Sequence, residues 1–152
     1  MKTINLYGPT HFSEILSENN DLAEAQNCTQ MNQRYNLLLI LTDGIINDMQ
    51  KTIDQIVRGS DLATAIIIVG VGDADFDSMD QLDADEEALY SQAYRKYMSA
   101  DIVQFVPFNE FKGNPHLLAK EILEEVPGQL LTFMRKNNIQ PHPRTEQQRQ
   151  AL

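Results

Sequence analysis

Asp43 is the first residue whose position could support chemistry, because it follows an apolar run in the sequence Thr42-Asp43-Gly44. A carboxylate at the end of a buried strand can bind a hard cation, cap the following turn or act as a base. Asp-Gly pairs are frequent in ordinary turns, so turn capping is the common role and cation binding is the functional alternative. Asp43 is therefore a candidate metal ligand that needs a second observation in its support.

Thr10 is the second candidate, since it follows the turn signal Gly8-Pro9 and precedes a helical pattern. Its hydroxyl could act as the N-cap of that helix, which is the common role of such a residue. The functional alternative is a metal-ligating hydroxyl beside Asp43. Divalent cations such as Mg²⁺ and Ca²⁺ take about six oxygen ligands. Thr10 and Asp43 alone therefore predict at most a weak site.

Residues 73–87 contain eight acidic side chains, and the first three are spaced as in the opening of a helix–loop–helix calcium site. The sixth position of that motif holds Ser78 where glycine is needed, and the twelfth holds Ala84 where the bidentate glutamate is needed. The motif is rejected for this reason. We interpret the stretch as a short helix with a solvated acidic face, which would attract calcium only weakly.

The sequence contains none of the catalytic patterns that would indicate an enzyme. Gly70-Val71-Gly72 lacks the third glycine and the lysine of phosphate-binding loops, and no Gly-x-Ser-x-Gly elbow occurs. The three histidines form no pattern with Cys28 that would indicate a nucleophile pair. Cys28 is the only cysteine, which excludes an intrachain disulfide and a thiolate metal site and fits a reducing, intracellular compartment. We expect a protein without enzymatic activity.

The elements that must position these residues alternate between strands and helices. Three short apolar runs predict strands at 37–41, 65–69 and 102–106, and the first two are expected to be buried on both faces. Amphipathic patterns predict helices over 12–25, 48–59 and 116–135, with Asp48 as an N-cap and a kink or division at Pro127. Residues 86–98 are expected to be helical or irregular. This order predicts an α/β fold, a parallel sheet with helices on both faces.

Ligands of such sheets bind at the carboxyl ends of the strands, where this sequence places the loops 42–48, 70–77 and 107–115. The length of 152 residues favours one domain, and the longest apolar runs are too short for a membrane span. The net charge of −10 argues against binding to nucleic acid and, through bulk charge, to anionic lipid. The polar end of the chain, from residue 137, predicts a disordered tail over 137–152.

Several segments, in order along most of the chain, resemble the C-terminal domain of the copine family. They are Leu6-Tyr7-Gly8-Pro9-Thr10-His11-Phe12, the segment 39–49 around Thr42-Asp43-Gly44, the strand and glycines of 66–72, Phe76–Met79, Leu82–Asp85, Asp101–Phe108 and Glu125–Leu130 with Met134. The resemblance implies a von Willebrand factor A-like, Rossmann-type fold, present in part over residues 1–136. In that fold a divalent metal, Mg²⁺ or Ca²⁺, is held by an Asp-x-Ser-x-Ser loop, a threonine and an aspartate. Thr10 and Asp43, which stand 33 positions apart, look like the last two.

No Asp-x-Ser-x-Ser sequence occurs in the chain, so the resemblance implies that Met1 begins inside the domain, after the first metal loop. Metal binding is therefore expected to be weak. The strand at 37–41 would lose a neighbour unless Ile4–Tyr7 or another chain covers it, and an uncovered apolar edge favours self-association. We expect the chain by itself to be marginally stable and to self-associate.

The family resemblance implies a function as the protein-interaction module of a calcium-dependent phospholipid-binding signalling adaptor. Protein partners would bind through the strand-end loops, while calcium-dependent binding to anionic phospholipid would reside in N-terminal domains that this sequence does not contain. The expected location is cytoplasmic and, for the longer protein, peripheral at the plasma membrane. The alternative is the similar domain of a RING-type ubiquitin ligase, which zinc-binding Cys and His residues would follow. A metal-dependent hydrolase would need a fuller ligand set and a base.

Overall fold

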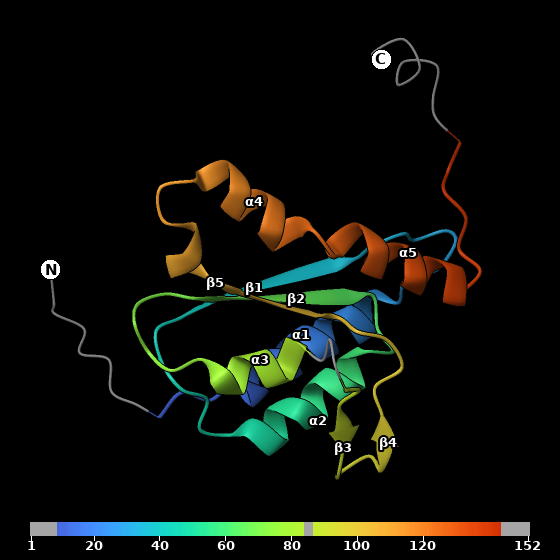
Figure 1. Cartoon of the computed structure of the whole chain (residues 1–152). Coiled ribbons are helices and arrows are strands. Elements are labelled where there is room, and N and C mark those ends of the chain that lie inside the picture. Colours follow the sequence, from blue (N-terminus) through green and yellow to red (C-terminus); the bar gives the residue numbers. More distant parts are fainter. Residues whose placement is uncertain (1–8, 84–86, 144–152) are drawn as a thin grey trace, which may run out of the picture.

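The computed structural model of the chain describes residues 9–83 and 87–143. Helices and strands alternate along most of this length (Figure 1). In chain order the elements are α1 (Ser13–Gln26), β1 (Asn36–Thr42), α2 (Met49–Gly59), β2 (Thr64–Gly70), α3 (Asp77–Asp83), β3 (Tyr90–Ser91), β4 (Lys96–Tyr97), β5 (Val103–Pro107), the 3₁₀ turn η1 (Phe108–Phe111), α4 (Pro115–Leu123) and α5 (Val126–Lys136). None of the described helices is long and apolar enough to cross a membrane.

Three parallel strands form the central sheet in the order β1-β2-β5. The register places Leu39 beside Ile67, and Ile67 beside Gln104. Helices α1, α2 and α3 lie on one side of this sheet, and α4 and α5 lie on the other (Figure 1). The predicted α/β architecture, a parallel sheet with helices on both faces, is confirmed.

The main core lies between the sheet and the helices α1, α2 and α3. Every residue of β2 is buried, as its unbroken apolar sequence predicts. Buried side chains from the three helices pack against the inward residues of the strands. The core formed in this way includes Phe12, Leu16, Ile56, Val57, Ile66, Ile68, Met79, Leu82, Val103 and Phe105. This packing holds the carboxyl ends of the three strands at one edge of the molecule.

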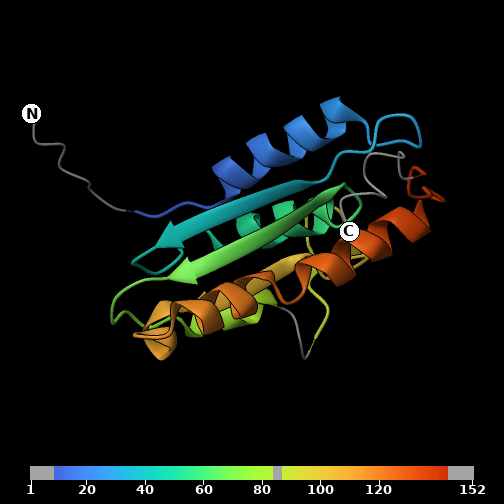
Figure 2. The same cartoon turned by 90° about the horizontal axis from the view of Figure 1, so that it is seen from above.

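The strand β1 differs from the prediction that it is buried on both faces. Leu37, Leu39 and Leu41 are 52%, 54% and 68% exposed, while Leu38 and Ile40 pack against the core. That prediction is therefore wrong for one face. The reason is that α4 and α5 pack against β5 and β2 and leave β1 uncovered in the view from above (Figure 2). Within the described residues no strand pairs with the outer edge of β1, and Ile4–Tyr7 lie outside them.

Two further segments can be compared with the sequence-based expectations, and the first of them differs. Residues 90–97, expected to be helical or irregular, form the small antiparallel hairpin of β3 and β4. The long helix predicted over 116–135 is divided into α4 and α5, with Pro127 in the first turn of α5, as the missing proline donor requires.

The start of the predicted disordered tail packs against the rest of the molecule. The Ile139 side chain is only 6% exposed. The Gln140 N–H donates to Gln30 Oε1 at 2.7 Å, and Gln33 Nε2 donates to the Gln140 carbonyl at the same distance. Contact with the loop before β1 thus continues past the predicted domain end at residue 136. Residues 144–152 lie outside the described residues, so disorder there stays a prediction.

A candidate metal centre at the carboxyl ends of the strands

The loops that follow β1, β2 and β5 lie at one edge of the sheet. The N–H of Val71, at the start of the second loop, donates to the carbonyl of Thr42, the last residue of β1, at 2.7 Å. The Asn109 amide nitrogen donates to the Gly72 carbonyl and, at 2.7 Å, to Asp73 Oδ1, which joins the second loop to the third. We call these loops, residues 43–48, 71–76 and 108–114, the rim.

Thr10 lies against the first loop of the rim, although the chain separates it widely from Asp43. Its N–H donates to Asn47 Oδ1 at 2.8 Å, and the Asn47 N–H donates to the Thr10 carbonyl at 2.9 Å. A bridge between Thr10 and Ile46 continues this pairing. A Cβ atom placed on Gly44 would be 3.9 Å from Thr10 Oγ1. The structure therefore brings the Thr10 hydroxyl beside the Asp43-Gly44 turn.

The prediction that Thr10 caps the following helix is wrong. Helix α1 begins at Ser13, and its first donors are bound by a residue from a distant part of the chain. Phe12 N–H donates to Asp48 Oδ1 and Ser13 N–H donates to Asp48 Oδ2, each at 3.0 Å. Because Asp48 supplies the cap, the Thr10 hydroxyl is free of that role.

Asp48 occupies the N-cap position of α2, as predicted, but its carboxylate caps α1. Toward its own helix α2, Asp48 Oδ1 accepts a hydrogen bond from the Thr52 hydroxyl at 3.1 Å and caps no backbone N–H there. Partial burial raises the pKa of Asp48, but hydrogen bonds from Ser13, Phe12 and Thr52 outweigh it and hold that pKa below its usual range. Asp48 is therefore a structural anion between two helices.

Asp43 is exposed at the rim, and within the described residues its carboxylate accepts no hydrogen bond. The turn that it begins is contacted by the Thr42 hydroxyl, which lies 3.4 Å from the Gly44 carbonyl and 3.5 Å from the Gly44 nitrogen. These contacts leave both Asp43 oxygens available to a ligand. The geometry thus places, on adjoining segments, a carboxylate and a hydroxyl that make no hydrogen bond to other described residues.

The donor atoms match a hard cation in type but not in number. Hydroxyl and carboxylate oxygens are the ligands that Mg²⁺ and Ca²⁺ prefer, and a full shell needs about six. Among the described residues, no group of three or more His, Cys, Asp or Glu side chains could hold a metal ion. Thr10 and Asp43 therefore form a partial site, and their role as ligands stays a prediction.

The acidic stretch lies on the second loop of the rim and on α3. Asp73, Asp75 and Asp77 are exposed, while Met79 and Leu82 are fully buried. Of these three acids only Asp77 belongs to α3, and Asp83 at the end of that helix is half-buried and accepts the Phe105 N–H at 3.0 Å, so an acidic outer face along the helix stays a prediction. Asp75 Oδ1 accepts the Asp77 N–H at 3.0 Å, and Asp73 is bound to Asn109, so two of these acids already act within the loop. Residues 84–86 lie outside the described residues.

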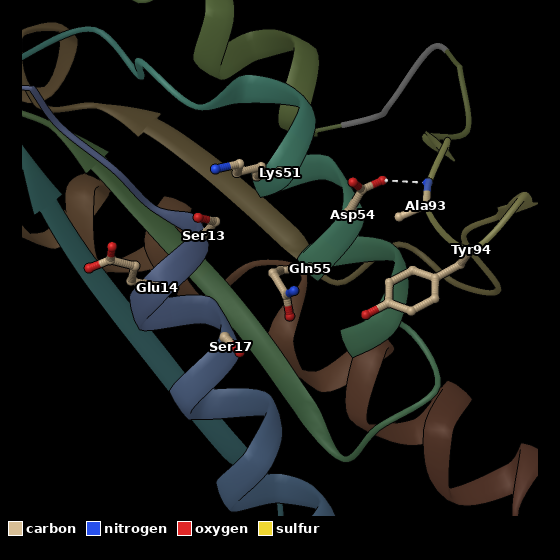
Figure 3. A pocket seen from close by; sticks show the side chains of 8 residues that line it. All are labelled: Ser13, Glu14, Ser17, Lys51, Asp54, Gln55, Ala93 and Tyr94. Carbon is tan, nitrogen blue, oxygen red and sulfur yellow. Dashed lines mark hydrogen bonds between the residues drawn. The ribbon is translucent and has the colours of Figure 1, made fainter.

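A separate polar cavity of about 290 Å³ lies between α1, α2 and the β3–β4 hairpin. Figure 3 shows that α1, α2 and the hairpin all contribute side chains to it. Its lining residues are Ser13, Glu14, Ser17, Lys51, Asp54, Gln55, Ala93 and Tyr94. Asp54 Oδ1 accepts the Ser91 hydroxyl at 2.6 Å and the Ala93 N–H at 3.4 Å, which fixes the hairpin on α2. Neither Thr10 nor Asp43 lines this cavity.

Comparison with known proteins places the chain in a family. A family model described as Copine matches residues 1–142. The chain belongs to the copine family. The α/β sheet described above is consistent with the von Willebrand factor A-like fold of the copine domain.

The curated relatives are copines and a receptor-associated protein. Copine-A from Dictyostelium discoideum is 45% identical over 140 residues, which are 92% of this chain and 23% of that protein. Copine-D from the same organism is 44% identical over 134 residues, 88% of this chain and 25% of its own length. The nicotinic receptor-associated protein 1 of Caenorhabditis elegans is 42% identical over 154 residues, 94% of this chain and 24% of its own. The chain spans about a quarter of the length of these relatives.

Sequence reasoning missed three residues that organise this copine site, namely Asn47, Asp48 as the cap of α1, and Asn109. Their partners lie 35 to 37 positions away in the chain, so no local pattern points to these contacts. The one sequence feature that could have pointed to Asn47 is its place shortly after the strand-end Asp-Gly pair, and many ordinary loops share that feature.

Proposed function

We propose that the chain is the protein-interaction module of a copine-type calcium-dependent phospholipid-binding signalling adaptor. Membership of the copine family supports this class of function. The observation that carries the proposal is the rim, where the loops after β2 and β5 are joined by hydrogen bonds and the loop after β1 presents an exposed Asp43 carboxylate that accepts no hydrogen bond within the described residues. A preformed group of strand-end loops is where sheets of this architecture bind their ligands.

The rim offers a partner an exposed apolar side chain and several exposed carboxylates. Ile45 follows the Asp43-Gly44 turn and is 55% exposed. Asp43, Asp73 and Asp75 are exposed on two of the three rim loops. A partner that places a small apolar side chain on Ile45, with basic or amide groups around it, would match this surface. We therefore propose the strand-end loops as the surface for protein partners.

A divalent cation, Mg²⁺ or Ca²⁺, would bind at Thr10 and Asp43 and link the rim to a carboxylate or carbonyl of the partner. Two protein ligands leave most of the coordination shell to water or to the partner, so the affinity of the chain alone is expected to be weak. A weak site of this kind would strengthen when a partner supplies further oxygen ligands.

Binding to anionic phospholipid in the presence of calcium is proposed for the longer protein and not for these 152 residues. The net charge of −10 opposes direct contact with an anionic surface. We propose a cytoplasmic location, peripheral at the plasma membrane when the lipid-binding domains are present. The name of the Caenorhabditis relative, nicotinic receptor-associated protein 1, suggests a membrane receptor as one type of partner.

We also propose that the chain is a binding protein without enzymatic activity, and that it self-associates weakly through the exposed face of β1. The absence of catalytic sequence patterns supports the first point. Leu37, Leu39 and Leu41, which are all more than half exposed on one strand, support the second.

Photo-crosslinking from the rim tests the proposed function. A benzophenone side chain replaces Ile45 on the rim or, as a control, the similarly exposed Leu123 at the end of α4. In an extract of the cells that make the protein, we expect the probe at 45 to yield defined protein adducts that weaken with EDTA and in Asp43→Ala. Adducts that are identical from both positions, or that ignore Asp43 and EDTA, would contradict an interaction site at the rim.

A further inference from the structure

Four hydrogen bonds connect the segment before α1 with the loop before α2. Two of them are the reciprocal bonds of Thr10 and Asn47, at 2.8 and 2.9 Å. The other two run from the backbone of Phe12 and Ser13 to the two oxygens of Asp48, each at 3.0 Å. We call Asn47 and Asp48 the clamp, because together they bind Thr10, Phe12 and Ser13, at and just before the start of α1, to the end of the Asp43 loop.

The clamp is anchored on both sides by buried residues. Phe12 is 3% exposed and Ile46 is 6% exposed, and both belong to the main core. Thr52, which is fully buried in α2, donates through its hydroxyl to Asp48. A hydrogen-bonded connection between two fixed elements leaves the intervening backbone little freedom. The clamp therefore sets where Thr10 stands relative to Gly44.

The side chains of the clamp are already used and cannot serve as the missing metal ligands without breaking it. Asn47 Oδ1 accepts the Thr10 N–H, and each Asp48 oxygen accepts an N–H at the start of α1. Releasing Asp48 would leave these N–H groups without their cap. Their role is therefore to hold other residues in place.

We infer that Asn47 and Asp48 are positioning residues that align the Thr10 hydroxyl with the Asp43 carboxylate for a divalent cation. This inference rests on the metal role proposed above for Thr10 and Asp43. The bonds of the clamp fix the backbone of Thr10, whereas Asp43 itself is held only by its place after β1. Loss of the clamp separates the two groups without removing either of them.

Asn47→Ala is the sharper test, because Asp48→Ala also removes the cap of α1 and could unfold the chain. Asn137→Ala is the control, since Asn137 Nδ2 donates to the Phe133 carbonyl at 2.9 Å at the end of α5, outside the rim. Isothermal titration with Mg²⁺ and Ca²⁺ compares both variants with the original chain. We expect about a tenfold loss of affinity in Asn47→Ala, as for other residues that orient metal ligands, and no loss in Asn137→Ala.

A measurement without metal tests the positioning role of Asn47 separately from the metal-binding role of Thr10 and Asp43. Nuclear magnetic resonance of the chain without metal reports the amide resonance of Gly44 and the contacts between Thr10 and Gly44 protons. We expect Asn47→Ala to weaken these contacts and shift the Gly44 amide resonance. Asn47→Asp should restore both because it keeps the acceptor oxygen, and Asn137→Ala should leave both unchanged. If Asn47→Ala changes neither the contacts nor the affinity, the positioning role is refuted. If the original chain binds no metal, that titration refutes the metal role and the resonance data decide the positioning of Thr10.

Discussion

Strands β1 and β2 have nearly the same apolar sequence and opposite environments. All seven residues of β2 are buried, whereas three leucines of β1 are more than half exposed. β2 has a strand on each side and helices on both faces, while β1 lies at the edge of the described sheet with one face uncovered. An unbroken apolar run therefore indicates a strand, but its neighbours decide how much of it is buried.

The largest effect on stability should come from truncating one apolar side chain to alanine, first in β2 and, for comparison, in β1. Ile68→Ala, at a β2 position that is 1% exposed, should lower the free energy of unfolding by about 2–5 kcal/mol because it leaves a cavity. Leu39→Ala, at a β1 position that is 54% exposed, should cost less than about 1 kcal/mol. Urea unfolding followed by circular dichroism measures both. Equal losses would mean that the β1 face is covered in solution.

Two Gly→Ala variants compare the close approach of α1 and α2 with the open surface of α5. Each variant adds one methyl group at one of these two places. A Cβ atom on Gly59 would stand 2.8 Å from Asn20 Oδ1 and 3.2 Å from Ile102 Cδ1, so Gly59→Ala should destabilise by about 1–3 kcal/mol. A Cβ atom on Gly128 meets nothing within 4 Å, so Gly128→Ala should stabilise α5 by up to about 1 kcal/mol. Thermal unfolding reports both, and a shift of the same sign in both variants would contradict this contrast.

Asp61 joins the two sides of the sheet, and its contribution should depend on pH. Its carboxylate lies 2.8 Å from Lys136 Nζ of α5 and 2.7 Å from Lys96 Nζ of the hairpin. Partial burial raises the pKa of Asp61, but hydrogen bonds from Lys136, Lys96 and Ser99 lower it well below its usual range. The contact therefore stabilises the fold above the unfolded pKa of about 3.9 and is lost as the pH falls toward the lower, folded pKa.

The measurement is the free energy of unfolding between pH 7 and pH 3 for the original chain and for Asp61→Asn. The difference between the two proteins should be below about 1 kcal/mol at pH 7, since the pair is partly exposed and screened. It should shrink further as the pH falls through 4. A difference that grows on acidification would contradict the sign of the pKa change.

The smallest effect on stability, and the clearest effect on association, should follow from a charge on the exposed face of β1. Leu39→Lys should leave the free energy of unfolding almost unchanged, because the side chain already faces solvent. It should reduce concentration-dependent self-association in sedimentation velocity runs, since edge lysines block strand pairing. Leu123→Lys on α4 is the control. Self-association that persists in Leu39→Lys would locate the contact elsewhere.

The sequence predicted the elements better than their surroundings. Local periodicity was enough for α1, α2, β2 and β5 and for the division of the long helix at Pro127, because each depends on residues close in the chain. The hairpin of β3 and β4 was missed because its strands have two residues each, too few to show an alternation. The exposed face of β1 was missed because helix placement over a sheet is a tertiary property.

The candidate site shows the same limit. Thr10 and Asp43 were selected by residue type, by their place after turns or strands, and by resemblance to the copine family, and the structure brings their segments together. Asp48 is the N-cap residue of α2, as its place in the sequence predicted, but its carboxylate caps α1 instead. Its true partners, Phe12 and Ser13, could be found only once the fold had brought the start of α1 to the rim.

The most direct test of the account is a calorimetric titration of Mg²⁺ and Ca²⁺ into the chain, Asp43→Ala and Asp75→Ala. Asp75→Ala removes one exposed carboxylate from a neighbouring rim loop and controls for the loss of negative charge. The account predicts weak saturable binding that Asp43→Ala abolishes and Asp75→Ala preserves. Binding that survives in Asp43→Ala, or no binding by the original chain at millimolar metal, would contradict a metal centre at Thr10 and Asp43.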